Sequence, residues 1–158
     1  MNALAERYVA QKIGSIFVYS HEAHPGEIYP YHTSMAQKFT HARALRDKLG
    51  VTRSILVDSL DGACHRAYGS MPNMTWIFSQ TGIPVYKSDW TDMDSVENMI
   101  IYLLGVIERR RAKKRMVPFR VERLDYRERD ADKFLAGLER SGPKAVVEYE
   151  SVFGSLIA

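Results

Sequence analysis

The chain has 158 residues, of which 46% are hydrophobic and 26% are charged, and its formal net charge is +3. This composition fits one globular domain with a sizeable core and excludes a chain that is disordered throughout. So mild a charge does not by itself imply a nucleic-acid partner, and we expect none. The single cysteine, Cys64, excludes an internal disulfide and a cysteine-rich zinc site.

No stretch reaches the roughly 20 apolar residues that a membrane span requires. The N-terminal residues also lack the apolar core of a signal peptide. We therefore expect a cytoplasmic protein that has no membrane partner.

Hydrophobic periodicity divides the chain into alternating helical and extended segments. The expected elements, in chain order, are a helix over 2–13, a buried strand over 15–20, a loop over 25–31, a helix over about 34–49, a buried strand over 54–58, a loop with room for a helical turn over 59–70, a hairpin over 75–86 and a helix from 95 to about 115. Small residues mark the boundaries: Gly14 ends the first helix, Thr33 or Ser34 caps the second, Gly82 supplies the hairpin turn, and Asp94 caps the last helix.

This order predicts an α/β fold. A helix between two strands is typical of a parallel βαβ crossover, and the hairpin then adds antiparallel strands. A mixed sheet closed by a helix is typical of the thioredoxin-like class. We expect such a core over 1–108 and a C-terminal α/β extension over 109–158.

Within the extension, residues 119–124 alternate like a strand. Asp130 or Asp132 is placed to start a helix that Gly142-Pro143 ends. The apolar pairs at 146–147, 152–153 and 156–157 could dock on other parts of the protein. The extension could serve as a dimer arm or as a lid over the site.

The first apolar run ends in a cluster of titratable residues, Tyr19-Ser20-His21-Glu22-Ala23-His24-Pro25. Open α/β sheets carry their sites at the carboxyl ends of strands. Glu22 and His24 are two positions apart, so in extended chain they project to the same side. A carboxylate beside an imidazole fixes its tautomer and raises its basicity, which is acid/base chemistry. The alternative interpretation is a capped loop with solvated histidines.

Four motifs together resemble a known family. They are Tyr19-x-x-Glu22-Ala23-His24-Pro25, Tyr29-Pro30-Tyr31-His32 before a helix with Ala42-Arg43, Val57-Asp58-x-x-Asp61, and Ala67-Tyr68-Gly69. The chain resembles the iodothyronine deiodinases, a thioredoxin-like family, from about Ala3 to about Leu104. The Glu-Ala-His-Pro run after a strand is the most specific part of this resemblance.

The resemblance implies a role for several residues. Tyr19, Glu22 and His24 would line the active site and form a proton-relay network, and His32 would lie near the iodinated ring of the substrate. Two features of this chain depart from the family. No cysteine precedes Cys64, so the loop that carries the family's selenocysteine or cysteine nucleophile has no counterpart, and Met74 stands where the family has a substrate-binding arginine.

The family's nucleophile loop follows a central strand, which also has no counterpart before the first helix of this chain. We expect its place to be filled, since unpaired buried amides are costly. A second copy of the chain, a different partner or the C-terminal extension could fill it. The resemblance therefore predicts a homodimer.

These observations predict a non-redox acid/base enzyme that acts on a small aromatic or polyketide-like metabolite by isomerisation, cyclisation, elimination or hydration. The expected catalytic residues are Glu22, His24, His32 and Tyr19. Neighbouring polar and aromatic side chains would bind the substrate: His21, Tyr29, Tyr31, Tyr68, Met74 and Trp76. We expect no cofactor and no metal. The alternatives are a non-catalytic protein that binds a ligand or caps a partner, and a thiol redox protein that uses Cys64.

Three further features have two interpretations each. His21, Glu22, His24 and His32 form an adequate metal-ligand set, but their spacing matches no strong motif. Cys64 beside His65 could be an activated thiol, although a small buried thiol is the preferred interpretation. The basic run over 109–115 could contact phosphates, but cations at a helix C-terminus and pairing with the acidic residues that follow explain it better.

Overall fold

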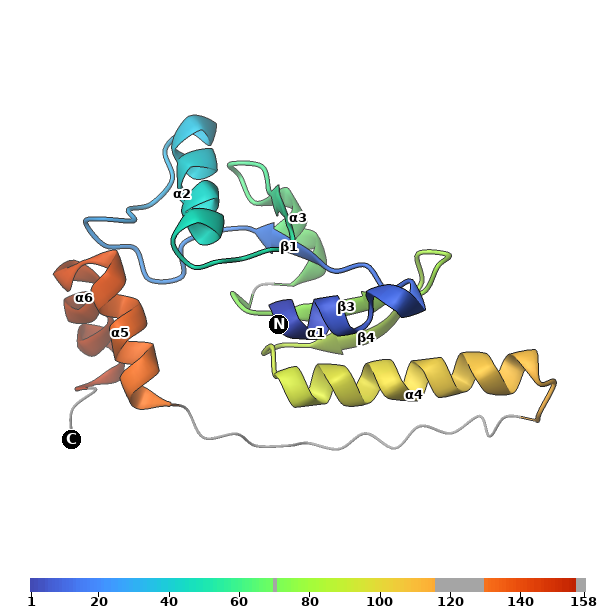
Figure 1. Ribbon diagram of the computed structural model, residues 1–158. Coiled ribbons are helices and arrows are strands. Elements are labelled where there is room, and N and C mark those ends of the chain that lie inside the picture. Colours follow the sequence, from blue (N-terminus) through green and yellow to red (C-terminus); the bar gives the residue numbers. More distant parts are fainter. Residues whose placement is uncertain (70, 116–129, 156–158) are drawn as a thin grey trace. The chain divides into compact units, whose positions relative to one another are not determined.

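A computed structural model describes residues 1–69, 71–115 and 130–155 (Figure 1). The elements in chain order are α1 (Asn2–Arg7), the 3₁₀ turn η1 (Val9–Gln11), β1 (Ile16–Tyr19), α2 (Met35–Asp47), β2 (Ser54–Val57), α3 (Ala63–Tyr68), β3 (Thr75–Phe78), β4 (Pro84–Ser88), α4 (Met93–Arg111), α5 (Ala131–Ser141) and α6 (Pro143–Phe153). The predicted α/β class is confirmed. No described helix is long and apolar enough to cross a bilayer.

The described elements form two compact units. The first contains α1, η1, β3, β4 and α4, and the second contains β1, α2, β2, α3, α5 and α6. The expected division into a core over 1–108 and an extension over 109–158 stays a prediction.

The core of the first unit lies between its helices. Leu4 and Tyr8 pack against Val96 and Ile100 of α4, and partly buried residues of the hairpin join them. Tyr8 donates a hydrogen bond of 3.0 Å to Glu97, which also forms an ion pair with an arginine of α1. The antiparallel hairpin β3–β4 confirms the prediction from the Gly-containing turn.

Side-chain caps set the helix boundaries. Ser34 Oγ accepts the backbone N–H of Gln37 at 3.2 Å, so Ser34 rather than Thr33 is the cap of α2. Asp130 caps α5 in the same way. The predicted cap of α4 is wrong: Asp92, not Asp94, accepts the backbone N–H of Ser95, and Asp94 lies in the first turn, where its charge meets the positive end of the helix.

The second unit contains a βαβ arrangement. Strands β1 and β2 pair in parallel, with Val18 opposite Leu56 and Tyr19 opposite Val57, and α2 connects them and packs on β2. The parallel crossover that the sequence predicts is therefore confirmed. It places the ends of both strands, and the loops that leave them, at one edge of this small sheet.

One expectation about the sheet is wrong. The strands are not buried on both faces: Ile16, Val18 and Leu56 are 57%, 40% and 52% exposed, while Tyr19 on the opposite face is buried. Side chains alternate across a strand, and a helix packs against this pair, so one face is covered and the other is not. The described residues form two two-stranded sheets, the parallel pair β1–β2 and the hairpin β3–β4, and the expected single mixed sheet stays a prediction.

The helical turn for which the loop after β2 had room is present as α3, which begins after Gly62 at a positive φ of 74°. The local structure differs from the sequence prediction in two more places. The first helix is shorter than 2–13, because α1 ends at Arg7 and a 3₁₀ turn follows. Gly142-Pro143 ends α5 as predicted, but Pro143 then begins α6 where only apolar segments were expected, since proline suits the first position of a helix.

The helices α5 and α6 form an antiparallel hairpin that packs on the loop after β1 (Figure 1). The backbone N–H of Ile28 donates to the carbonyl oxygen of Ser141 at 3.0 Å, and the Glu27 carboxylate accepts the backbone N–H of Lys144 at 3.1 Å. Gly26 lies against the same carbonyl, with room for no side chain. The strand expected over 119–124 and the apolar pair at 156–157 lie outside the described residues.

Candidate functional site

The end of β1 carries a buried tyrosine that joins two other polar side chains. Tyr19 is only 6% exposed, and its hydroxyl donates a hydrogen bond to the carboxylate of Glu22. The same oxygen lies 3.0 Å from Nε2 of His32. The structure thus brings together three of the four predicted catalytic residues.

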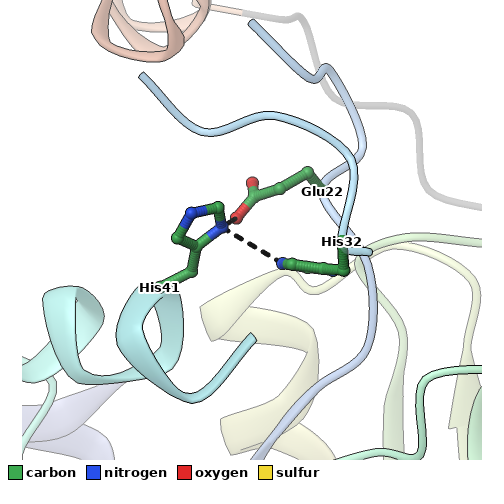
Figure 2. A group of neighbouring side chains, drawn as sticks. All are labelled: Glu22, His32 and His41. Carbon is green, nitrogen blue, oxygen red and sulfur yellow. Dashed lines mark hydrogen bonds and ion pairs between the residues drawn. The ribbon is translucent and has the colours of Figure 1, made fainter. Parts of the chain in front are cut away.

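A fourth member of this cluster comes from α2. His41 is 9% exposed, and its Nδ1 lies 3.2 Å from Nε2 of His32 and 3.6 Å from Oε1 of Glu22. Figure 2 shows these three side chains pointing toward one another from the loop after β1, the loop before α2 and α2 itself. We call Tyr19, Glu22, His32 and His41 the polar cluster.

Sequence reasoning missed His41. A signal for it was present, because Lys38, His41 and Ala42 are the buried positions of α2 and their spacing of three and four residues marks one helical face. A histidine on the buried face of a helix that packs beside a strand end is a candidate for the site at that end.

Local structure holds each member in place. The Ser34 cap fixes the start of α2, two residues after His32. The Tyr29 ring packs edge-on against His41, with ring centroids 5.2 Å apart, and the Tyr19 ring packs in the same manner against His32 at 5.4 Å. Such contacts orient both imidazoles without using their nitrogens.

Two members of the polar cluster, Tyr19 and His32, carry no charge at neutral pH. Burial raises the pKa of Tyr19, and its hydrogen bond to the Glu22 carboxylate raises the pKa further, so the phenol keeps its proton. Burial lowers the pKa of His32 to about 4, and the electrostatic effects of the neighbouring His41 and Lys38 act in the same direction. His32 is therefore an uncharged imidazole that carries one ring N–H.

A second polar group supports the polar cluster from the end of β2. The buried Asp58 carboxylate accepts three backbone N–H groups, those of Ser59, Cys64 and His65, at 2.8 to 2.9 Å. Lys38 is fully buried, and its ammonium donates to the carbonyl oxygen of Ser59 at 2.8 Å. Lys38 lies one turn before His41, so this contact ties the α2 face that carries His41 to the loop after β2.

Glu22 and His24 are not brought together as the expected acid/base pair. The His24 ring lies edge-on to Phe134 of α5 and Tyr149 of α6, at centroid distances of 5.6 and 5.5 Å, and burial lowers its pKa. The chain between Glu22 and His24 bends, so spacing by two does not place both side chains on one side. The catalytic role of His24 stays a prediction.

The other predicted site residues differ in their surroundings. His21 is exposed and packs against His65. Tyr31 and Tyr68 are also exposed, whereas Tyr29 packs against His41 of the polar cluster. Met74 and Trp76 belong to the first unit, where Trp76 stacks beside Phe78, and their role as substrate contacts stays a prediction.

The environment of Cys64 does not favour a reactive thiol. Burial raises its pKa, and the negative charge of Asp58 raises it further. Thiol chemistry requires the thiolate, and this site disfavours it.

None of the comparisons with protein-family models, curated proteins and solved structures finds a match to this chain. The geometry of the site is therefore the basis for a function. The sequence offered His21, Glu22, His24 and His32 as a metal-ligand set. The set that the structure brings together differs from it, because His41 takes part and His21 and His24 do not. Glu22, His32 and His41 are the described side chains that could hold a metal ion.

Proposed function

We propose that this protein is an acid/base enzyme that moves protons on a small aromatic or polyketide-like metabolite. The observation that carries the proposal is the continuous chain of contacts from Glu22 through Tyr19 and His32 to His41. A carboxylate, a phenol and two imidazoles in contact are the groups that general acid/base catalysis uses.

The hydrogen bonds assign a role to each member of the polar cluster. Tyr19 donates its one proton to the Glu22 carboxylate, and its oxygen also contacts Nε2 of His32. As a carboxylate, Glu22 can take a proton from one atom of a substrate and return it to another, while Tyr19 and His32 hold the carboxylate in place. Isomerisation, cyclisation, elimination and hydration each need a proton removed at one atom and supplied at another, and none of them needs a thiol.

The proposed scaffold is thioredoxin-like and of the deiodinase type. The grouping of Tyr19, Glu22 and His32 supports this, because the resemblance implies those positions at one site. The parallel βαβ unit and the antiparallel hairpin are compatible with such a fold. The raised pKa of Cys64 is in line with an activity that is not redox chemistry.

We also propose a cytoplasmic homodimer that binds neither membranes nor nucleic acid. The exposed apolar face of β1–β2, formed by Ile16, Val18 and Leu56, supports an interface between copies. The free thiol of Cys64 suits a reducing compartment. Light scattering on the full chain tests the dimer, and a Val18→Lys variant that stays dimeric would exclude this face as the interface.

A non-catalytic binding protein is the second candidate. It is favoured by the burial of Tyr19 and His41, which leaves Glu22 and His32 as the accessible members of the polar cluster. This candidate predicts that a small molecule binds and leaves the protein unchanged.

One experiment separates the two candidates. Metabolite extracts of the source organism are incubated with the wild type and with a Glu22→Gln/His41→Ala double variant, and products are compared by mass spectrometry. A species consumed by the wild type alone supports the enzyme. Its mass change indicates the reaction: zero for isomerisation and one water for hydration or dehydration. A metabolite retained unchanged by the wild type supports the binding protein instead. A His24→Ala variant with full turnover removes His24 from the catalytic set.

A further inference from the structure

Three potential metal-ligand atoms converge in the polar cluster. Oε1 of Glu22, Nε2 of His32 and Nδ1 of His41 all lie within 4.8 Å of one another (Figure 2). Two of the separations are 3.2 Å, between the imidazole nitrogens, and 3.6 Å, between His41 and the carboxylate. A tetrahedral ion with bonds of about 2.1 Å holds neighbouring ligand atoms about 3.4 Å apart, which is close to both of these separations.

The chemistry of the donors narrows the class of ion. Two imidazole nitrogens and one carboxylate oxygen form the ligand set of many catalytic zinc sites and of non-haem iron(II) sites. Magnesium and calcium prefer sites made of oxygen atoms, so this set favours a first-row transition ion or zinc.

Neighbouring side chains orient the three potential ligands. The Tyr19 hydroxyl bonds to Glu22, and the rings of Tyr29 and Tyr19 pack edge-on against the two imidazoles. Groups that orient ligands in this way are a regular part of metal sites. Glu22 and His32 are partly exposed, which leaves a route for an ion and for water to fill the remaining coordination positions.

We propose that Glu22, His32 and His41 bind one divalent ion of the zinc or iron(II) class through Oε1, Nε2 and Nδ1. The proposal goes beyond the acid/base function and does not depend on it, since binding requires neither substrate nor turnover. A bound ion would add a Lewis acid at the place where the side chains alone provide proton transfer.

Binding is measured on the full-length, tag-free protein after treatment with EDTA and dialysis. Cobalt(II) serves as the optical probe, and zinc is titrated by calorimetry. In each separate titration, with cobalt(II) or with zinc, we expect one ion to bind per chain. Glu22→Gln keeps the shape of the side chain and should weaken binding by more than about 100-fold, beyond the roughly 10- to 100-fold loss typical of residues that only support a ligand.

The chain offers matched controls, because it has five histidines. His32→Ala and His41→Ala should abolish the cobalt spectrum, whereas His21→Ala and His24→Ala should leave the spectrum and the affinity unchanged. If His41→Ala does not fold, an NMR titration of the wild type with zinc takes its place. Zinc should then shift the imidazole signals of His32 and His41 alone.

The proposal is overturned if the wild type binds neither ion, or if His21→Ala and His24→Ala lose binding while His32→Ala keeps it. Turnover of a metabolite by the EDTA-treated protein, with no ion bound, would retain the acid/base function and reject an ion requirement. Stoichiometric binding without turnover would retain the ion site and reject the enzyme.

Discussion

Nε2 of His32 and Nδ1 of His41 face each other at 3.2 Å, although one residue lies in a loop and the other on a buried helical face. Two imidazole nitrogens at this distance require a proton between them or a cation beside them. The acid/base proposal and the ion proposal correspond to these two possibilities, and both depend on the contact between the loop after β1 and α2.

Removing the Tyr19 hydroxyl should free the Glu22 carboxylate from its hydrogen bond and impair catalysis without unfolding the protein. We expect Tyr19→Phe to lower the metabolite turnover by about 10²-fold or more, the usual size of a general acid/base contribution. The free energy of unfolding should fall by only about 1 kcal/mol, the value of a typical hydrogen bond. Tyr102→Phe, on the exposed surface of α4, is the matched control and should change neither quantity. Full turnover in Tyr19→Phe would show that the phenol does not position Glu22 for catalysis.

Lys38 should contribute to stability far more than an exposed lysine of the same helix region. Lys38→Ala removes a fully buried stem and the hydrogen bond to Ser59, so unfolding in urea should become easier by about 2–5 kcal/mol. Lys48→Ala, at the exposed C-cap, should cost about 0.5 kcal/mol or less. A Lys38→Met variant separates the contribution of the apolar stem from that of the ammonium, because methionine keeps an apolar side chain of similar length and lacks the charged donor. Equal losses in both alanine variants would contradict the role assigned to Lys38.

The Asp58 carboxylate should make stability depend on pH in the acid range. Burial alone would raise its pKa, but hydrogen bonds from His65, Cys64 and Ser59 outweigh burial and hold the pKa below its usual value. A group whose folded pKa is depressed stabilises the fold above its unfolded pKa, about 3.9, and loses that contribution as the pH falls through the folded pKa. The stability difference between wild type and Asp58→Asn should therefore be largest at neutral pH and shrink below about pH 4. Urea denaturation from about pH 3 to 7 measures it, and a difference that stays constant would refute the assignment.

Two glycine substitutions should act with opposite signs on the helical hairpin α5–α6. A Cβ at Gly26 would lie 2.0 Å from the carbonyl oxygen of Ser141, so Gly26→Ala should separate the hairpin from the loop after β1 and destabilise the protein by roughly 1–3 kcal/mol. A Cβ at Gly137, within α5, would meet no described atom within 4 Å, so Gly137→Ala should stabilise the helix by about 0.5–1 kcal/mol. Urea denaturation and limited proteolysis measure both. The packing is refuted if Gly26→Ala is as stable as Gly137→Ala.

Features that depend on a few consecutive residues were predictable. The Ser34 and Asp130 caps, the turn with Gly82 and the parallel pairing of β1 with β2 follow from local hydrogen bonding and from the order of the elements. The cap of α4 was misplaced by two residues, because Asp92 and Asp94 are equally suitable in type and only the path of the backbone distinguishes them.

The candidate site was predictable only in part. Tyr19 and Glu22 follow directly from a strand that ends in titratable residues, and His32 was expected from a family resemblance. The pairing of Glu22 with His24 failed, because an extended spacing of two does not hold where the chain turns toward α5 and α6.

The sequence by itself determined the turns, the helix starts near Ser34 and Asp130 and the position of the polar residues after β1, because each depends on backbone hydrogen bonds within about four residues. Only the tertiary structure decided that His41 joins Glu22 and His32 while His24 packs against two aromatic rings. Those contacts depend on where the buried face of α2 and the hairpin α5–α6 meet the loop after β1. They are packing events between distant segments, and no local pattern encodes them.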